Sequence, residues 1–215
     1  MGGRGRLGGA RFELSELGLF PLGIVLLPGQ RIPLHIFEQR YRELIGECLA
    51  EQREFGLILA DDAGLRSVGT KAKVAEVLER FEDGRLDIVV EGGERFRLLE
   101  LTEGRSFHTA RVDPFEEEAE SPSDDGTKRA MRLFHELKNL VGSDVDEPEA
   151  DTLLSFALAA RVDFGPEAKQ ELLEISSERR RLALVIRLLD RALTGIRLER
   201  ERREIASRNG NVSRG

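Results

Sequence analysis

The sequence has little of what disulfides and metal centres require. Among its 215 residues there are three histidines and one cysteine, Cys48, and there is no tryptophan. A single cysteine excludes an intramolecular disulfide and leaves too few ligands for an ordinary zinc site. We therefore expect no metal and no cofactor, and the composition fits a reducing, cytoplasmic setting.

Long apolar runs are also missing. No stretch approaches the ~20 apolar residues that a membrane-spanning helix needs, so we expect no membrane partner. Residues 1–11 are rich in glycine and arginine and lack the apolar segment of a secretory signal peptide. From their composition we expect residues 1–14 and 206–215 to be disordered tails.

Positive charge is in deficit. The net charge is -7, with 33 Lys and Arg against 40 Asp and Glu. A general binder of phosphate backbones is usually basic, and a single tyrosine leaves few aromatic platforms besides phenylalanine for base stacking. This balance argues against nucleic acid as the main partner. We interpret the run Arg179–Arg181 as the solvated first turn of a helix rather than a nucleic-acid patch.

Motifs that carry catalysis are absent as well. The sequence contains no Gly-x-x-x-x-Gly-Lys-Ser/Thr loop, no His-Glu-x-x-His helix and no Gly-x-Ser-x-Gly elbow. We therefore expect a non-catalytic protein. A serine–lysine dyad has no fixed spacing, so a peptidase stays an open alternative, although no serine lies in a glycine-flanked turn that would activate it. Cys48 falls on an apolar helix stripe and is expected to be an inert core thiol.

The first half of the chain, residues 15–116, has the pattern of a β-rich domain. Short apolar runs are separated by turn signals, and many short strands at this spacing indicate a barrel or a compact sandwich. Asp83-Gly84 between two apolar runs predicts a hairpin. Gly92-Gly93 predicts a further turn. One helix interrupts the strands, and we expect Phe37 and Tyr41 to anchor it on the barrel.

The second half is expected to be helical. Residues 117–127 are acidic and contain Pro, Ser and Gly, which predicts a linker or exposed loop. Residues 128–205 have the apolar periodicity of a bundle of four helices. Pro148 and Pro166 are placed to begin the second and third helices. Ser176 or Ser177 can cap the last helix, whose charged end is expected to project into solvent.

One part of the sequence resembles a known family. The segments that carry the resemblance are Leu19-Phe20-Pro21-Leu22, Val25-Leu26-Leu27-Pro28-Gly29, Ile32-Pro33-Leu34-His35-Ile36-Phe37-Glu38-Gln39-Arg40-Tyr41-Arg42, Val68-Gly69-Thr70 and Gly92-Gly93-Glu94-Arg95-Phe96. They resemble the N-terminal domain of the Lon protease family, in which nearly every element of the opening occurs in the same order, and the resemblance covers roughly residues 15–200.

The resemblance implies an α+β fold, a PUA-like β pseudo-barrel with an inserted helix, followed by a C-terminal helical bundle. In the Lon family this region helps to select unfolded or degron-bearing substrates, and the ATPase and protease domains come after it. It thus implies a stand-alone, non-catalytic module that binds polypeptides in protein quality control. RNA binding by a PUA-like fold, or docking on another ATPase or protease, are the alternatives, and the oligomeric state is left open.

The resemblance also supplies the candidate peptide-binding residues, which are Pro33, His35, Phe37, Arg40 and Tyr41. The same apolar and proline-rich pattern can serve folding alone. If the segment is a strand, His35 faces opposite to its two apolar neighbours, where a hydrogen-bonded structural role competes with binding. We expect an apolar groove near the junction of barrel and bundle, or a free strand edge that accepts an extended segment.

Overall fold

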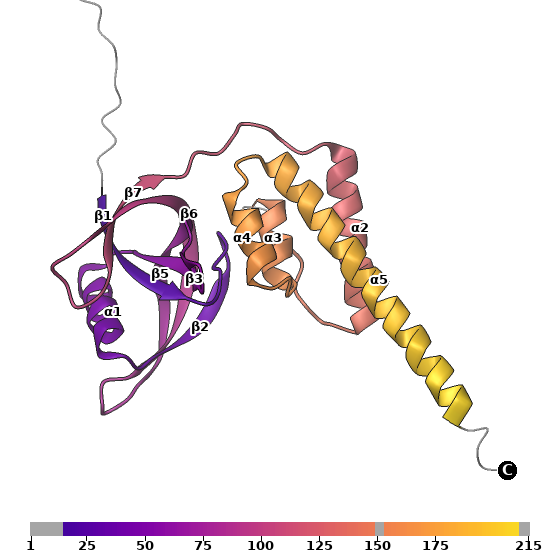
Figure 1. Ribbon diagram of the computed structural model, residues 1–215, viewed down its shortest axis with the longest axis horizontal. Coiled ribbons are helices and arrows are strands. Elements are labelled where there is room, and N and C mark those ends of the chain that lie inside the picture. The colour runs from indigo at the N-terminus through magenta and orange to yellow at the C-terminus, as the bar shows by residue number, and fades with distance from the viewer. Residues whose placement is uncertain (1–14, 149–152, 211–215) are drawn as a thin grey trace, which may run out of the picture.

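The computed structural model describes residues 15–148 and 153–210 and has an α+β fold, a β barrel followed by a helical bundle (Figure 1). The expected N-terminal tail lies outside the described residues. The elements are β1 (Ser15–Leu22), β2 (Arg31–Ile36), α1 (Gln39–Glu51), β3 (Phe55–Asp61), β4 (Gly64–Leu65), β5 (Val68–Arg80), β6 (Leu86–Thr102), β7 (Thr109–Pro114), α2 (Asp124–Val141), α3 (Leu154–Arg161), α4 (Pro166–Glu174) and α5 (Glu178–Gly210).

The barrel closes through its first strand. The order β1-β7-β6-β5-β3 is antiparallel, and a parallel pairing of β1 with β3 joins the two ends of the sheet into a ring. The strand β2 pairs with β6 outside this ring, and β4 pairs with β3. The expected pseudo-barrel is therefore confirmed. Pro21 lies in the half of β1 that pairs with β3, beyond the residues that pair with β7.

The long strand β6 continues through Gly92-Gly93 with a bend, so the turn expected there is wrong. Along one edge, β6 pairs with β2 up to Glu91 and with β7 from Phe96. Its other edge pairs with β5, and this pairing has a bulge at the point where the first edge changes partner. A Cβ atom at Gly92 would lie 2.3 Å from the carbonyl oxygen of Leu27. The glycines thus permit close backbone packing at a bend rather than a chain reversal.

The hairpin between β5 and β6 is confirmed. The backbone N–H of Phe81 donates to the carbonyl of Arg85 at 3.0 Å, and that of Gly84 donates to the carbonyl of Phe81 at 2.9 Å. Gly84 has a φ of 84°, a left-handed conformation that glycine adopts without steric cost.

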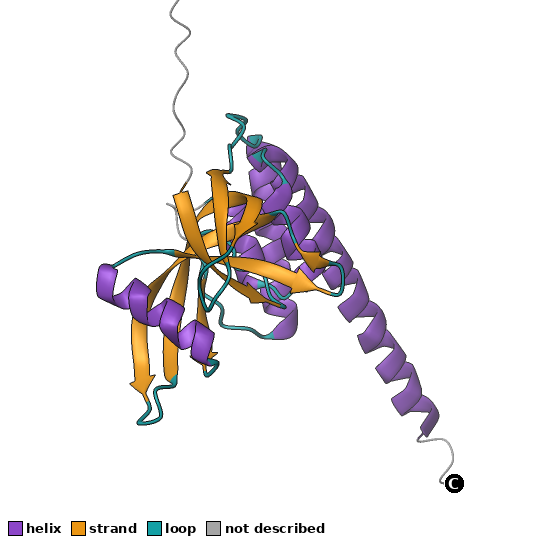
Figure 2. Cartoon of the chain, turned by 60° about the vertical axis from the view of Figure 1, so that its left-hand side comes forward, coloured by secondary structure: helices purple, strands orange, loops and turns teal. Residues whose placement is uncertain are grey.

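The inserted helix α1 covers one side of the barrel, and the bundle lies on the other (Figures 1 and 2). The apolar stripe of α1 is buried against the strands and consists of Tyr41, Leu44, Ile45 and Cys48. Phe37 does not anchor the helix, because α1 begins two residues later and the Phe37 ring is 60% exposed. Phe37 was expected to anchor the helix because it falls at helical spacing from Tyr41 and Leu44, but the helix itself begins only at Gln39.

The four expected helices of the bundle are present. Ser123 caps α2 by accepting a hydrogen bond from the N–H of Gly126 at 3.1 Å, and Ser177 accepts one from Arg180 at 3.3 Å at the start of α5. Pro166 opens α4, as expected. Pro148 does not open a helix, since α3 begins at Leu154.

One apolar core joins the bundle to the barrel. It contains the inward faces of the four helices together with four barrel side chains, Val25, Leu27, Leu59 and Val68. The side chain of Gln170 on α4 also donates to the carbonyl of Val68 at 3.1 Å. The two parts therefore pack on each other directly.

The last helix extends past the rest of the bundle (Figure 1). It continues to Gly210, so residues 206–210 are helical and not part of a tail. Arginine and glutamate are good helix formers, and an i,i+4 pair joins Arg203 to Glu199. Within the described part of the chain, no helix combines the length and the apolar character needed to cross a membrane.

Candidate functional site

Three of the five candidate residues share an exposed surface beside β2. Side chains alternate along this strand, so that Pro33 and His35 face solvent. The ring of His35 stacks on that of Phe37 and meets that of Phe81 edge-on, each at 6.0 Å between centroids, and its Nδ1 lies 2.5 Å from Oδ1 of Asp87. We call Pro33, His35, Phe37 and Phe81 the aromatic face.

The other two candidates differ in position. Tyr41 does not belong to a binding surface, because its ring is buried in the barrel core, 4.1 Å from that of Phe20. Arg40 is partly exposed, but it pairs with Glu38 at 2.8 Å and lies over the Tyr41 ring. Tyr41 is buried because it falls on the apolar stripe of α1, whereas Pro33, His35 and Phe37 precede that helix.

The free edge of β2 is poorly suited to accept another strand. The N–H of Gly92 donates to the carbonyl of Gln30, and antiparallel pairs alternate, so the even-numbered residues of β2 bond to β6. The backbone of Pro33 therefore faces the free edge, where proline has no N–H to donate. A proline at this position blocks pairing with an extended segment.

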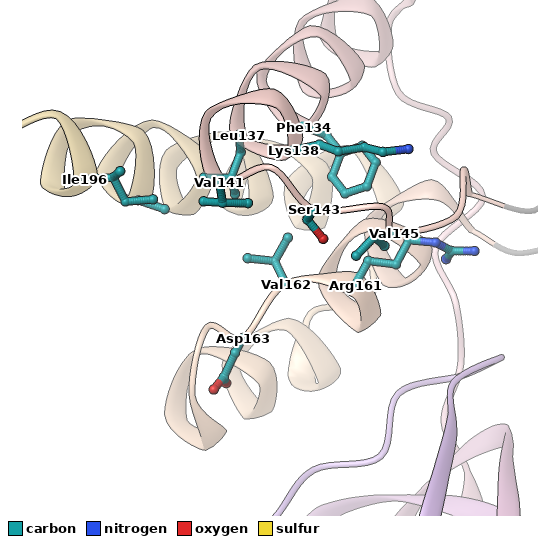
Figure 3. A pocket seen from close by; sticks show the side chains of 11 residues that line it. Phe134, Leu137, Lys138, Val141, Ser143, Val145, Arg161, Val162, Asp163 and Ile196 are labelled. Atoms are coloured by element: carbon teal, nitrogen blue, oxygen red, sulfur yellow. The ribbon is translucent and has the colours of Figure 1, made fainter. Parts of the chain in front are cut away.

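An apolar groove lies within the bundle (Figure 3). It has a volume of about 270 Å³ and is bounded by α2, the loop after it, the end of α3 and α5. Val141, Val145 and Val162 face one another across it, and half of the Val141 side chain is exposed. Its remaining apolar wall consists of Phe134, Leu137, Ala192 and Ile196.

The charged groups at the rim of this groove already have partners in the chain. Lys138 pairs with Glu147 at 3.4 Å, and Arg161 donates to the backbone carbonyls of Asp146 and Glu147. Asp163 accepts a hydrogen bond from the N–H of Gly165 at 3.1 Å. The groove thus offers a ligand mainly apolar contact.

The sequence held a signal for this groove that the site prediction missed. The apolar stripe of α2 continues to its last residue, Val141, and the following loops carry Val145 and Val162 between polar residues. Single apolar residues in loops are common on protein surfaces, so this pattern alone does not locate a groove.

A recess is also present at the junction of barrel and bundle, where we expected the groove. It has a volume of about 520 Å³ and lies between the loop before β2, the bend of β6 and the start of α3. Phe115, Phe156 and Leu153 supply apolar walls, but Arg95 and Glu117 also line it and pair with each other. It is therefore more polar than the bundle groove.

The expectation that Arg179–Arg181 forms a solvated face is wrong for Arg181. Its side chain is fully buried, pairs with Glu117 at 2.9 Å and Glu178 at 3.1 Å, and lies over the ring of Phe156. Arg179 and Arg180 are exposed. The burial of Arg181 is matched by one neighbouring carboxylate, Glu178, and one from a distant part of the sequence, Glu117.

No reactive centre is evident among the residues that the structure describes. No group of three or more His, Cys, Asp or Glu side chains in residues 15–148 and 153–210 is placed to hold a metal ion. Burial raises the pKa of the Cys48 thiol to about 11, which keeps it protonated and unreactive.

Comparison with known proteins identifies the family. Residues 16–191 match the family described as the ATP-dependent protease La (LON) substrate-binding domain. With most of the chain covered, this protein belongs to the Lon substrate-binding domain family. The resemblance seen in the sequence is confirmed.

The relatives are Lon proteases. The chain is 30% identical over 194 residues to the Lon protease of Paraburkholderia phytofirmans and 29% identical over 196 residues to that of Anaeromyxobacter dehalogenans, with 82% of this chain covered in each case. It spans only 24% and 23% of their lengths. The matched region of this chain is thus the substrate-binding domain alone.

Solved structures share the fold. A Lon N-terminal domain protein from Xanthomonas campestris superposes with a TM-score of 0.65 at 25% identity, covering 80% of this chain and 98% of that one. The N-terminal domain of Lon protease from the Mycobacterium avium complex gives a TM-score of 0.63 at 19% identity, with 82% and 98% covered.

Proposed function

We propose that this domain binds unfolded or degron-bearing polypeptides by taking an apolar side chain into the bundle groove, and that it does so without catalysis. The observation that carries the proposal is the groove itself, with apolar walls and a rim whose charged side chains already have an ion-pair or backbone hydrogen-bond partner in the chain. A folded protein buries most of its large apolar side chains, whereas an unfolded one exposes them. Such a groove therefore distinguishes unfolded from folded chains without reading a particular sequence.

The size of the groove sets its affinity. A volume of about 270 Å³ accommodates one large aliphatic or aromatic side chain. Burying such a side chain contributes roughly 1.5–3 kcal/mol, which is less than the free energy of a micromolar complex. We expect weak binding at one groove and stronger binding where a polypeptide makes a second contact.

The second contact in this proposal is the aromatic face. Phe37 is the most exposed aromatic side chain of the barrel, and its neighbours Pro33 and His35 also face solvent. An apolar residue of the ligand can pack on these rings by side-chain contact alone, which suits a strand edge that proline blocks to pairing. Arg40 lies nearby on α1, and its partly exposed guanidinium, which pairs with Glu38, can also contact a ligand bound there.

The test is a titration of a fluorescently labelled, permanently unfolded protein against the full chain, followed by anisotropy. Val141→Glu places a charge at the mouth of the groove and should weaken binding by about tenfold, because the carboxylate would have to be desolvated. Leu198→Glu is the matched control, since Leu198 is a similarly exposed apolar residue of α5 outside the groove.

Equal loss of affinity in both variants, or no saturable binding by the unaltered chain at tens of micromolar, would contradict the proposal.

Phe37→Ser extends the test to the aromatic face, with Leu99→Ser as its control because Leu99 is an exposed apolar residue elsewhere on the barrel. The unaltered chain with casein, with and without ATP, should show no proteolysis.

The same proposal includes a cellular setting. The relatives are Lon proteases, which supports a role in protein quality control alongside an ATPase or protease. A cytoplasmic location is supported by the single cysteine, which is kept as a buried thiol. Co-purification of the tagged chain from native lysate, before and after ATP depletion, tests for such a partner.

A further inference from the structure

Ion pairs hold the segment between β7 and α2 against the N-terminal end of α5. We call residues 115–120 the strap, and Figure 1 shows it crossing from the barrel to the bundle. Three consecutive arginines of α5 each pair with one of its carboxylates. The pairs are Glu117–Arg181 at 2.9 Å, Glu118–Arg180 at 2.6 Å and Glu120–Arg179 at 2.7 Å. The acidic run and the arginine run are thus complementary parts of one contact.

A buried network continues this contact into the barrel. Arg95, on the bend of β6, has a side chain only 2% exposed. It pairs with Glu117 and donates through Nη1 to the carbonyl oxygens of Leu173 at 2.5 Å and Ile175 at 2.8 Å. These carbonyls belong to the C-terminal end of α4 and the residue after it. Arg95 is therefore a barrel side chain that donates hydrogen bonds to carbonyl groups at the end of a bundle helix that have no partner within that helix.

The network balances its charges. Arg181 shares Glu117 with Arg95 and also pairs with Glu178, which accepts two hydrogen bonds from Ser155, at 2.9 Å from its N–H and 2.5 Å from its hydroxyl. Both guanidinium groups lie over the Phe156 ring, at 4.4 and 5.3 Å from its centroid. We call Arg95, Glu117, Glu178 and Arg181 the clasp. Two buried cations and two carboxylates leave no buried charge without a partner.

We propose that the clasp, through Arg95, fixes the orientation of the barrel on the bundle, so that the two parts unfold as one cooperative unit. The apolar core that the two parts share contains four buried barrel side chains among the described residues, and apolar contacts are not directional. The hydrogen bonds of Arg95 are directional and reach two carbonyls and one carboxylate at once. This inference is independent of the proposed function.

The chain itself offers separate probes of its two parts. It has no tryptophan and a single tyrosine, Tyr41, which is buried in the barrel core. Tyrosine fluorescence therefore reports unfolding of the barrel, while far-ultraviolet circular dichroism is dominated by the helices of the bundle. In the unaltered chain, thermal transitions followed by the two signals should coincide.

The decisive variant is Arg95→Met, which keeps the length of the side chain and removes its charge and donors. The two transitions should then separate by roughly 5 °C or more. Arg97→Met is the matched control, because Arg97 lies two residues along the same strand, is exposed and contacts the Phe115 ring from 5.1 Å. Its two transitions should still coincide.

Coincident transitions in Arg95→Met, or separate transitions in the unaltered chain, would overturn the proposal. If Arg95→Met does not fold, Glu117→Gln serves in its place, because glutamine keeps the shape of the side chain and removes the anion that both arginines share. Separation of the two signals in Glu117→Gln would support the clasp, and coincidence at a lower temperature would refute it.

Discussion

At the scale of single residues, the same side-chain type takes opposite roles within one short run. Arg179 and Arg180 are exposed, as their sequence context predicts, while Arg181 is fully buried. One of its partners, Glu178, is only three residues away, but Glu117 and the Phe156 ring, which also make its burial tolerable, are distant in sequence. Burial of an arginine is decided by tertiary partners, and these cannot be obtained from periodicity.

Cys48 shows the opposite case, because its position on the apolar stripe of α1 was enough to predict that its side chain is buried. The pKa of its thiol is raised to about 11 by burial, so only about one molecule in a thousand carries the thiolate at pH 8. We expect no reaction of the native chain with a disulfide reagent at pH 8 over minutes, and one equivalent of reaction after unfolding in denaturant. Rapid labelling of the native chain would contradict its burial.

At the scale of elements, the Gly92-Gly93 pair shows why turn chemistry alone misleads. Two adjacent glycines are common in turns, but they also occur where a backbone passes close to another. The sequence predicted the hairpin at Asp83-Gly84 correctly because its flanking strands are adjacent in the chain. The contact between Gly92 and Leu27 joins segments that only the closed barrel brings together.

Gly92→Ala should therefore destabilise the barrel. Its Cβ would lie 2.3 Å from a backbone oxygen that cannot move aside cheaply, and we expect a loss of about 1–3 kcal/mol. Gly195→Ala is the control, since nothing lies within 4 Å of a Cβ there and the residue is inside α5. That change should stabilise the chain by about 0.5–1 kcal/mol. Denaturant unfolding measures both, and a neutral Gly92→Ala would argue against the close approach.

At the scale of the whole molecule, the fold class and the order of its parts could be predicted from the sequence. Strand spacing, the amphipathic α1 and the family-like opening segment sufficed for that. The binding surface could not be predicted in the same way. Of the five candidate residues, Tyr41 is buried in the core, and the bundle groove draws on residues from three helices and two loops.

Stability should depend on pH on the acid side. The pKa of Glu91 is lowered from its ordinary 4.5 by hydrogen bonds from Lys73 and Arg31, and that of Asp61 is lowered from 3.8 by the N–H of Ala63 and by Arg66. A lowered carboxylate pKa stabilises the folded state above the unfolded value, and this contribution is lost as pH falls through the folded value. The melting temperature should be steady from pH 7 to about 5.5 and fall below about 4.5.

The charge-removing variant Glu91→Gln provides the matched measurement. It should melt lower than the unaltered chain at pH 7, and the difference should shrink as pH falls through the lowered pKa of Glu91, where this carboxylate also becomes protonated in the unaltered chain. A difference that stays constant across this range would show that the ion pairs of Glu91 do not contribute.

The pairing of β1 has a consequence for how the chain reaches its native state. Ser15 pairs with Val112 and Leu19 with Gly56, so β1 is synthesised before both of the strands that it pairs with, and long before β7. Contacts of such long sequence separation form slowly. During synthesis the half of β1 that pairs with β7 therefore stays exposed until nearly all of the barrel has left the ribosome. A domain for which we propose binding of unfolded chains thus passes through a stage in which it exposes an unpaired segment of its own.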